Sequence, residues 1–171
     1  MASALIVIAS ASCIDVPTEA QVKVPGVARF YADSNPMACA DWNCRSLESW
    51  EYAEMDELLS RARANALSGG DLDCFDLFER GRSKLSANKV YVARQQPSFA
   101  PTGTIAGYNQ NAPNEVYIME TRWASAPAAM NSMDHEMEHE RLGPRPPTRG
   151  YDSWEQDIQG VANTCQYWAE I

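Results

Sequence analysis

Apolar positions recur with a helical period between about residues 47 and 62. From Ser46, which can cap a helix, the pattern predicts a long helix that runs to about residue 67 and ends at Gly69 and Gly70. Residues 71–85 keep a weaker helical spacing that Gly81 interrupts, so we expect a short helix or an irregular segment there.

The pattern then changes to runs of β-branched and aromatic residues. These runs predict strands at residues 90–93, 102–108 and 115–122, the last two forming a hairpin around the turn formers of residues 109–114. A further short strand is expected earlier, at residues 27–32.

Two more helices follow the strands. The first is capped by Ser125 and stopped by Gly143, and its methionines form one stripe while its histidines lie on roughly the opposite face. After the stiff connector of residues 144–147, Ser153 and Gln156 have the spacing of a capping box that begins the last helix. The expected fold class is therefore α+β: a small mixed sheet packed on the histidine-bearing helix, with a preceding long helix and a C-terminal helix.

Length, composition and charge restrict the class of protein. The 171 residues suit one main domain, with 45% hydrophobic and 22% charged residues. The formal net charge of -9 argues against nucleic acid or an anionic membrane surface as a partner. We expect a monomer.

The N-terminal 13 residues are apolar and rich in small side chains, which is typical of the end of an export signal. Small residues directly before Cys13 resemble the cleavage and lipidation site of bacterial lipoproteins, which would attach the protein to a membrane through a lipid on that cysteine. The competing interpretation is a buried first strand around residues 5–8. Residues 14–26, with two prolines and no sustained period, are expected to form a tether, so the folded domain would span residues 27–171.

The cysteine count also favours export. With Cys13 set aside, an even number remains, which predicts two disulfides in an oxidising compartment; their pairing is open among three connectivities. The alternative is a cytosolic protein with scattered buried thiols. The four cysteines concerned are Cys39, Cys44, Cys74 and Cys165.

Both histidines of the protein lie in the sequence His135-Glu136-Met137-Glu138-His139, which has the form HExxH. On a helix, residues four apart lie one above the other, so two imidazoles can reach a single metal ion while Glu136 stands beside a metal-bound water. The alternative is a charged, solvated helix face. The motif favours a zinc site, although it supplies only two of the three protein ligands that a catalytic zinc usually has.

Strands followed by an HExxH helix, a connector and a further helix resemble the zincin metallopeptidases, and in outline the short secreted bacterial members. The resemblance covers about residues 90–160. It implies that His135 and His139 bind zinc and that Glu136 is the general base. Arg145 occupies the position where metzincins have their third histidine, so the resemblance is to zincins whose third ligand is a carboxylate from a later helix.

Three carboxylates come into question as that third ligand. Glu155 is the first choice because it lies in the first turn of the last helix at the edge of its apolar face; Asp157 and Asp152 are the alternatives, and each could instead simply favour a helix N-terminus. Tyr151 is a candidate donor to the oxyanion, a role that tyrosine has in some zincins, or else a half-buried aromatic residue.

The expected function is zinc-dependent hydrolysis of peptide bonds in a peptide or protein substrate, by a metal-activated water with a glutamate as general base. Two alternatives stay open. One is an extracytoplasmic binding or structural module of zincin shape without catalysis, and the other is a lipoprotein scaffold whose histidines bind nothing.

Overall fold

The computed structural model describes residues 12–15, 39–98, 100, 103–108, 114–143, 145–146 and 148–171. The strand expected at residues 27–32 lies outside these ranges. So do most of the expected export segment and tether, of which residues 12–15 are described.

In the described part of the chain, five strands form one mixed sheet in the order β1-β4-β5-β3-β2. β4 and β5 pair antiparallel, as the predicted hairpin requires, whereas β3 and β5, and β1 and β4, pair parallel. The strands are β1 (Ser12–Asp15), β2 (Arg45–Ser46), β3 (Val90–Ala93), β4 (Thr104–Tyr108) and β5 (Val116–Met119).

Four long helices and two short ones accompany the sheet in the described residues. They are α1 (Cys39–Trp42), α2 (Ser49–Gly69), α3 (Leu72–Ser86), the 3₁₀ helix η1 (Glu120–Ala124), α4 (Ala126–Leu142) and α5 (Tyr151–Glu170). The prediction of an α+β protein with a small mixed sheet, a long early helix and a C-terminal helix is confirmed at this level.

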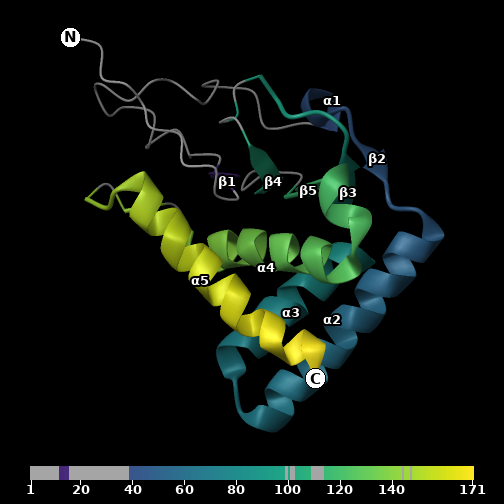
Figure 1. Ribbon diagram of the computed structural model, residues 1–171, viewed down its shortest axis with the longest axis vertical. Helices are drawn as coiled ribbons and strands as arrows, with labels where there is room; N and C mark the ends of the chain where they lie inside the picture. Colours follow the sequence, from purple (N-terminus) through teal and green to yellow (C-terminus); the bar gives the residue numbers. More distant parts are fainter. Residues whose placement is uncertain are drawn as a thin grey trace.

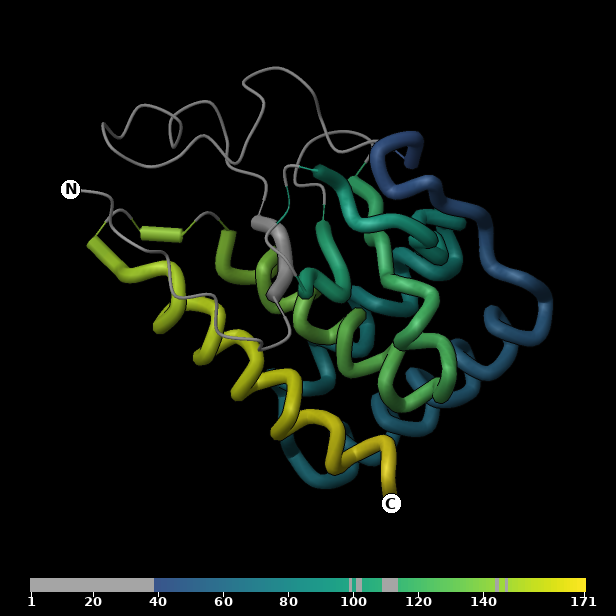
Figure 2. The backbone as a smooth tube through the Cα atoms, turned by 45° about the horizontal axis from the view of Figure 1, so that its top comes forward, coloured from purple at the N-terminus to yellow at the C-terminus, as the bar shows by residue number. Residues whose placement is uncertain are grey.

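The long helices pack together on one face of the sheet, with α4 next to the strands and α2, α3 and α5 around it (Figure 1). Figure 2 shows α5 running along one side of this helical layer to the C-terminus. On the other face of the sheet, Trp42 of α1 stacks on Tyr117, with ring centroids 5.5 Å apart, and Tyr117 stacks on Tyr91.

The strand predicted over residues 115–122 is wrong in its second half. It ends at Met119, which is the last residue of β5 with a partner in β3, at Ala93. Without a neighbouring strand to accept its hydrogen bonds, the backbone from Glu120 onward turns into the 3₁₀ helix instead.

The irregular segment considered for residues 71–85 is a regular helix, α3. A Cβ built on Gly81 would stand 3.4 Å from side-chain atoms of both Leu59 in α2 and Met133 in α4. The glycine that weakens the helical propensity lies buried against two other helices, and tertiary packing outweighs propensity.

Two helices begin at other residues than the predicted caps. α2 is capped by Glu48, whose backbone N–H donates to the carboxylate of Glu51 at 2.7 Å, and Arg45 binds that carboxylate through both of its terminal nitrogens. α5 begins at Tyr151 after the cap Gly150, so Ser153 lies inside its first turn and donates to the Gly150 carbonyl.

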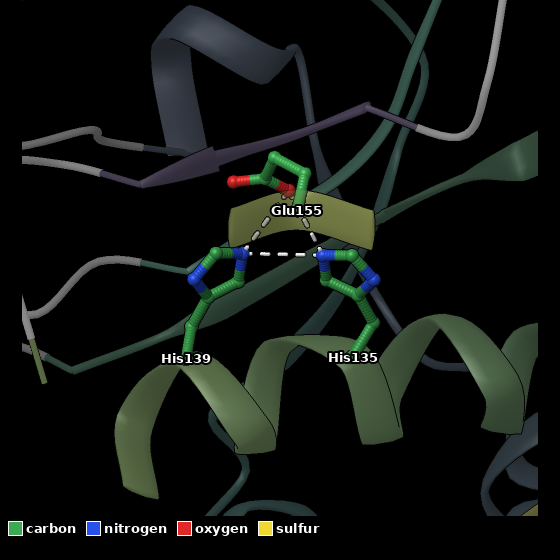
Figure 3. A group of neighbouring side chains, drawn as sticks. All are labelled: His135, His139 and Glu155. Carbon is green, nitrogen blue, oxygen red and sulfur yellow. Dashed lines mark hydrogen bonds and ion pairs between the residues drawn. The ribbon is translucent and has the colours of Figure 1, made fainter. Parts of the chain in front are cut away.

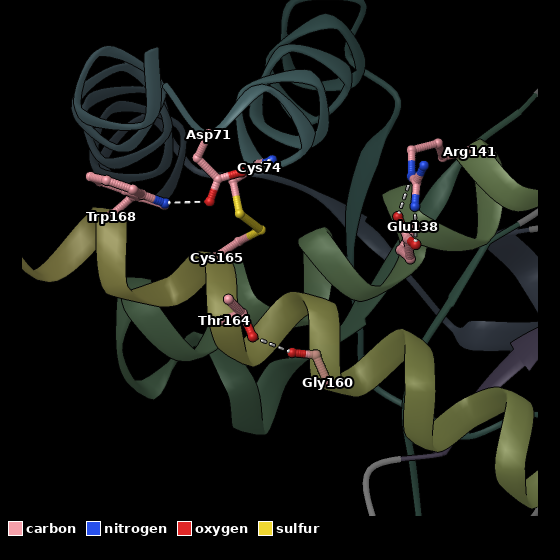
Figure 4. The surroundings of a disulfide bond; sticks show 8 residues. All are labelled: Asp71, Cys74, Glu138, Arg141, Gly160, Thr164, Cys165 and Trp168. Atoms are coloured by element: carbon pink, nitrogen blue, oxygen red, sulfur yellow. Dashed lines mark hydrogen bonds and ion pairs between the residues drawn. A yellow bond between two sulfur atoms is a disulfide. The ribbon is translucent and has the colours of Figure 1, made fainter. Parts of the chain in front are cut away.

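Two disulfides join the four cysteines other than Cys13, as their even number predicted. One closes the small loop between Cys39 and Cys44, and the other links Cys74 in α3 to Cys165 in α5 (Figure 4). Next to the second disulfide, the indole N–H of Trp168 donates to Asp71 at 2.9 Å. The two bonds indicate an oxidising, extracytoplasmic environment. Among the described residues, no helix has both the length and the apolar character needed to span a bilayer.

The long-range disulfide should contribute more to stability than the local one. In the chain-entropy model, a bond that closes a loop across 91 residues stabilises by about 4 to 5 kcal/mol, and one across 5 residues by about 2 kcal/mol. We expect Cys74→Ala/Cys165→Ala to lower the free energy of unfolding by clearly more than Cys39→Ala/Cys44→Ala, as measured by urea denaturation. Equal losses in the two double variants would contradict the assignment of the main covalent constraint to the α3–α5 link.

Candidate metal centre

The central part of helix α4 is enclosed by protein on all sides. Its first turn is fixed by Ser125, whose hydroxyl accepts a hydrogen bond from the N–H of Ala128, and it ends where Gly143 adopts a positive φ of 69°. Every residue from Ala129 to His139 is buried, because the helix packs against the sheet as well as against α2, α3 and α5. The methionine stripe is buried, and the opposite histidine face is buried too.

The histidine face meets a carboxylate from α5. Nε2 of His135 lies 3.1 Å from Nε2 of His139, and one carboxylate oxygen of Glu155 lies 3.2 Å from the first nitrogen and 3.4 Å from the second (Figure 3). The exposed fractions are 1% for His135, 0% for His139 and 8% for Glu155. Three potential ligand atoms from two helices therefore converge on one point inside the protein.

The spacing of these three atoms fits a metal ion. Tetrahedral zinc with bonds of about 2.0–2.1 Å places neighbouring ligand atoms roughly 3.3 Å apart, and the three observed separations of 3.1, 3.2 and 3.4 Å lie around that value. One ligand atom from each of the three residues lies within 4.8 Å of the other two, so the group could hold a metal ion. The geometry defines a possible metal site without identifying the metal.

The electrostatics of the cluster suit cation binding. Burial is the main cause that lowers the pKa of His135, with the nearby His139 acting in the same direction, so that its ring is neutral and keeps a lone pair at pH 7. Burial would raise the pKa of Glu155, but the contacts of its carboxylate with His135 and His139 outweigh that effect and bring its pKa to about 2. The carboxylate is thus held in its charged form.

The other ring nitrogen of His135 also has a partner. Its Nδ1 lies 2.9 Å from Oε1 of Gln159, which follows Glu155 by one turn of α5. Outer contacts of this kind orient a metal-binding histidine. Gln159 was not predicted from the sequence. The one sign of its role there is its position four residues after Glu155, on the same face of the helix.

The remaining residues predicted for the site lie around this cluster. Glu136 is fully buried and points about 100° around α4 from His135, while Tyr151 is half-buried in the first turn of α5, one turn before Glu155. Neither belongs to the group of three ligand atoms. Asp152 and Asp157 are exposed, and Asp157 pairs with Arg149, so Glu155 is the one of the three candidate carboxylates that the structure brings to the histidines.

Two more acidic residues of α4 are buried beside the motif. Glu138 forms a two-pronged ion pair with Arg141, with both contacts at 2.6 Å. Asp134 is completely buried, and neither of its carboxylate oxygens has a hydrogen-bond partner in the described structure. Burial raises the pKa of Asp134 well above its usual range, which favours the neutral form of the side chain.

Comparisons of the chain with protein-family models, with curated proteins and with solved structures give no significant match.

Metal binding can be tested directly on this cluster. We expect the wild-type protein to bind one zinc ion per chain, measured by mass spectrometry after dialysis, and we expect His139→Ala or Glu155→Ala to weaken binding by more than the roughly 10 to 100-fold typical of losing an outer-shell partner. Asp157→Ala is the matched control, because it removes an exposed carboxylate of the same helix. Wild-type protein that retains no zinc would refute the assignment.

Burial of Asp134 predicts a pH-dependent stability. Because the folded-state pKa of Asp134 is raised, the folded protein holds a proton that the unfolded chain releases above the ordinary pKa, so this residue costs stability as the pH rises. We expect Asp134→Asn to raise the melting temperature at pH 7 and to have little effect near pH 3. A gain that was the same at both pH values would show that the charge of Asp134 is not its cause.

Proposed function

We propose that this protein is a zinc-dependent peptidase whose metal is held by His135, His139 and Glu155. The observation that supports this most is the convergence of the two histidines of the HExxH motif with a carboxylate from a later helix, at separations of 3.1 to 3.4 Å. The same arrangement of donors is what a resemblance to carboxylate-ligand zincins implies.

Zinc is favoured over magnesium and calcium by the chemistry of the donors. Two imidazole nitrogens and one carboxylate oxygen form a ligand set typical of catalytic zinc, in which a water occupies the fourth position. Magnesium and calcium prefer sites made of oxygen atoms alone.

The residues around the cluster have the roles that peptide hydrolysis needs. The bound metal would lower the pKa of its water towards neutrality and polarise the scissile carbonyl. Glu136, next to His135 in sequence and shielded from solvent, would be the general base that takes the proton of that water and returns it to the leaving amine. Tyr151, one turn before Glu155, would donate a hydrogen bond to the oxyanion.

A second candidate is a non-catalytic, extracytoplasmic module of zincin shape that binds a metal for stability. The burial of the cluster favours it, since the most exposed of the three ligands is Glu155 at 8%. Structural zinc sites are closed, whereas catalytic ones keep an open position. A peptide substrate would reach the metal only after a movement of the groups that cover it.

The disulfides support a location outside the cytoplasm, where such a peptidase would act as a secreted or lipid-anchored monomer of the bacterial envelope. The proposed lipid attachment is at Cys13, which the structure places in β1 at the edge of the sheet.

The catalytic role of Glu136 separates the two candidates. We expect Glu136→Gln to keep one zinc per chain and to abolish cleavage of an unstructured protein such as casein, because the amide cannot accept the proton of the water. Glu138→Gln is the matched control: it changes the other glutamate inside the motif and should retain both zinc and cleavage. Zinc binding without any cleavage by the wild-type protein would favour the non-catalytic module.

A further inference from the structure

Three side-chain amides lie together behind His135. Nε2 of Gln159 donates to Oδ1 of Asn131 at 3.1 Å and to Oδ1 of Asn163 at 2.8 Å, and Nδ2 of Asn131 donates to Oδ1 of Asn163 at 3.2 Å. Asn131 is buried in α4, whereas Asn163 is exposed on α5. The three amides thus form a closed set of hydrogen bonds that ends at His135.

This set results from two matching stripes of residues. Residues 131, 135 and 139 lie four apart on α4, and residues 155, 159 and 163 lie four apart on α5, so each stripe follows one face of its helix. The contacts pair 139 with 155, 135 with 159 and 131 with 163, in antiparallel order. The metal cluster and the amide set are therefore the two ends of one helix–helix contact.

The structure places the Gln159 amide with its NH₂ group towards the two asparagines. Both hydrogens of its NH₂ group are used by the oxygens of the two asparagines, which leaves its own oxygen facing Nδ1 of His135 at 2.9 Å. An oxygen at that position requires a proton on Nδ1. A neutral ring with its proton on Nδ1 has its lone pair on Nε2, the nitrogen that faces Glu155 and His139.

We propose that Asn131 and Asn163 are positioning residues, which hold Gln159 so that His135 keeps its proton on Nδ1 and offers Nε2 to the metal. This proposal rests on the metal site described above and adds the residues that prepare it. The amides perform this task without adding a negative charge to a site that already contains buried carboxylates.

Zinc affinity in two backgrounds tests the proposal. Gln159→Leu removes the acceptor and should raise the Kd for zinc by about 10 to 100-fold, and Asn131→Ala/Asn163→Ala should raise it in the same direction. Gln159→Glu has an oxygen at both positions, so it needs no orienting partner: its Kd should be no weaker than that of the wild type, and the two asparagine substitutions should have no further effect in that background. Competition with a chromophoric chelator measures these constants.

The opposite pattern would overturn the proposal. Equal losses from the asparagine substitutions in the wild-type and Gln159→Glu backgrounds, or no loss in either, would mean that the asparagines do not act through the orientation of the amide. Should the double variant fail to fold, Asn163→Ala alone serves the same comparison, because Asn163 is exposed, and its smaller loss should vanish in the Gln159→Glu background.

A measurement on the metal-free protein distinguishes this proposal from the proposed function. In ¹⁵N-resolved NMR at pH 7, Nδ1 of His135 should carry a proton in the wild type, and the proton should be shared between both ring nitrogens in Asn131→Ala/Asn163→Ala. An unprotonated Nδ1 in the wild type would refute the positioning role whether or not zinc binds. A protonated Nδ1 that depends on the asparagines, in a protein that binds no zinc, would refute the metal site and leave the positioning role intact.

Discussion

The enclosure of the central part of α4, residues 129–139, is the constraint on which the rest of the structure depends. A helix that carries two histidines and three acidic residues between Asp134 and His139 would normally keep one side in water, yet none of these side chains is exposed. Burying an ionised group costs free energy unless a partner compensates it. The packing around α4 therefore has to supply a partner for each charge or keep the group neutral.

The structure uses different solutions on different sides of the helix. Glu138 is neutralised by Arg141 one turn later on the same helix, and burial raises the pKa of Asp134, which favours its neutral form. The histidines are compensated from outside α4, by Glu155 and Gln159 of α5. The α3–α5 disulfide joins Cys165 of α5 to another helix, so the segment that carries these partners is covalently attached to the helical layer.

The sequence predicted the parts of the site that follow from spacing along one helix. Two histidines four apart on a helix must lie on one face, and Glu155 was favoured over its neighbours because it lay at the edge of an apolar face. This reasoning could not find the three amides, because their hydrogen bonds are made between two different helices. These residues are Gln159, Asn131 and Asn163. The fold has the same limit, because sequence spacing does not show contacts between helices. Gly81 predicted a break in the helix, but in the structure it packs next to the side chains of Leu59 and Met133 and the helix continues.

The position of Glu155 also affects the conformational entropy that the chain loses on folding. An ion bound by His139 and Glu155 would close a loop of about 16 residues, which includes the connector between α4 and α5. A covalent link across a loop of that length removes conformational entropy from the unfolded state worth about 3 kcal/mol. The metal would then act as a reversible crosslink, which ties the ends of the two helices together with the same sort of restraint that the cysteines provide at the other end of α5.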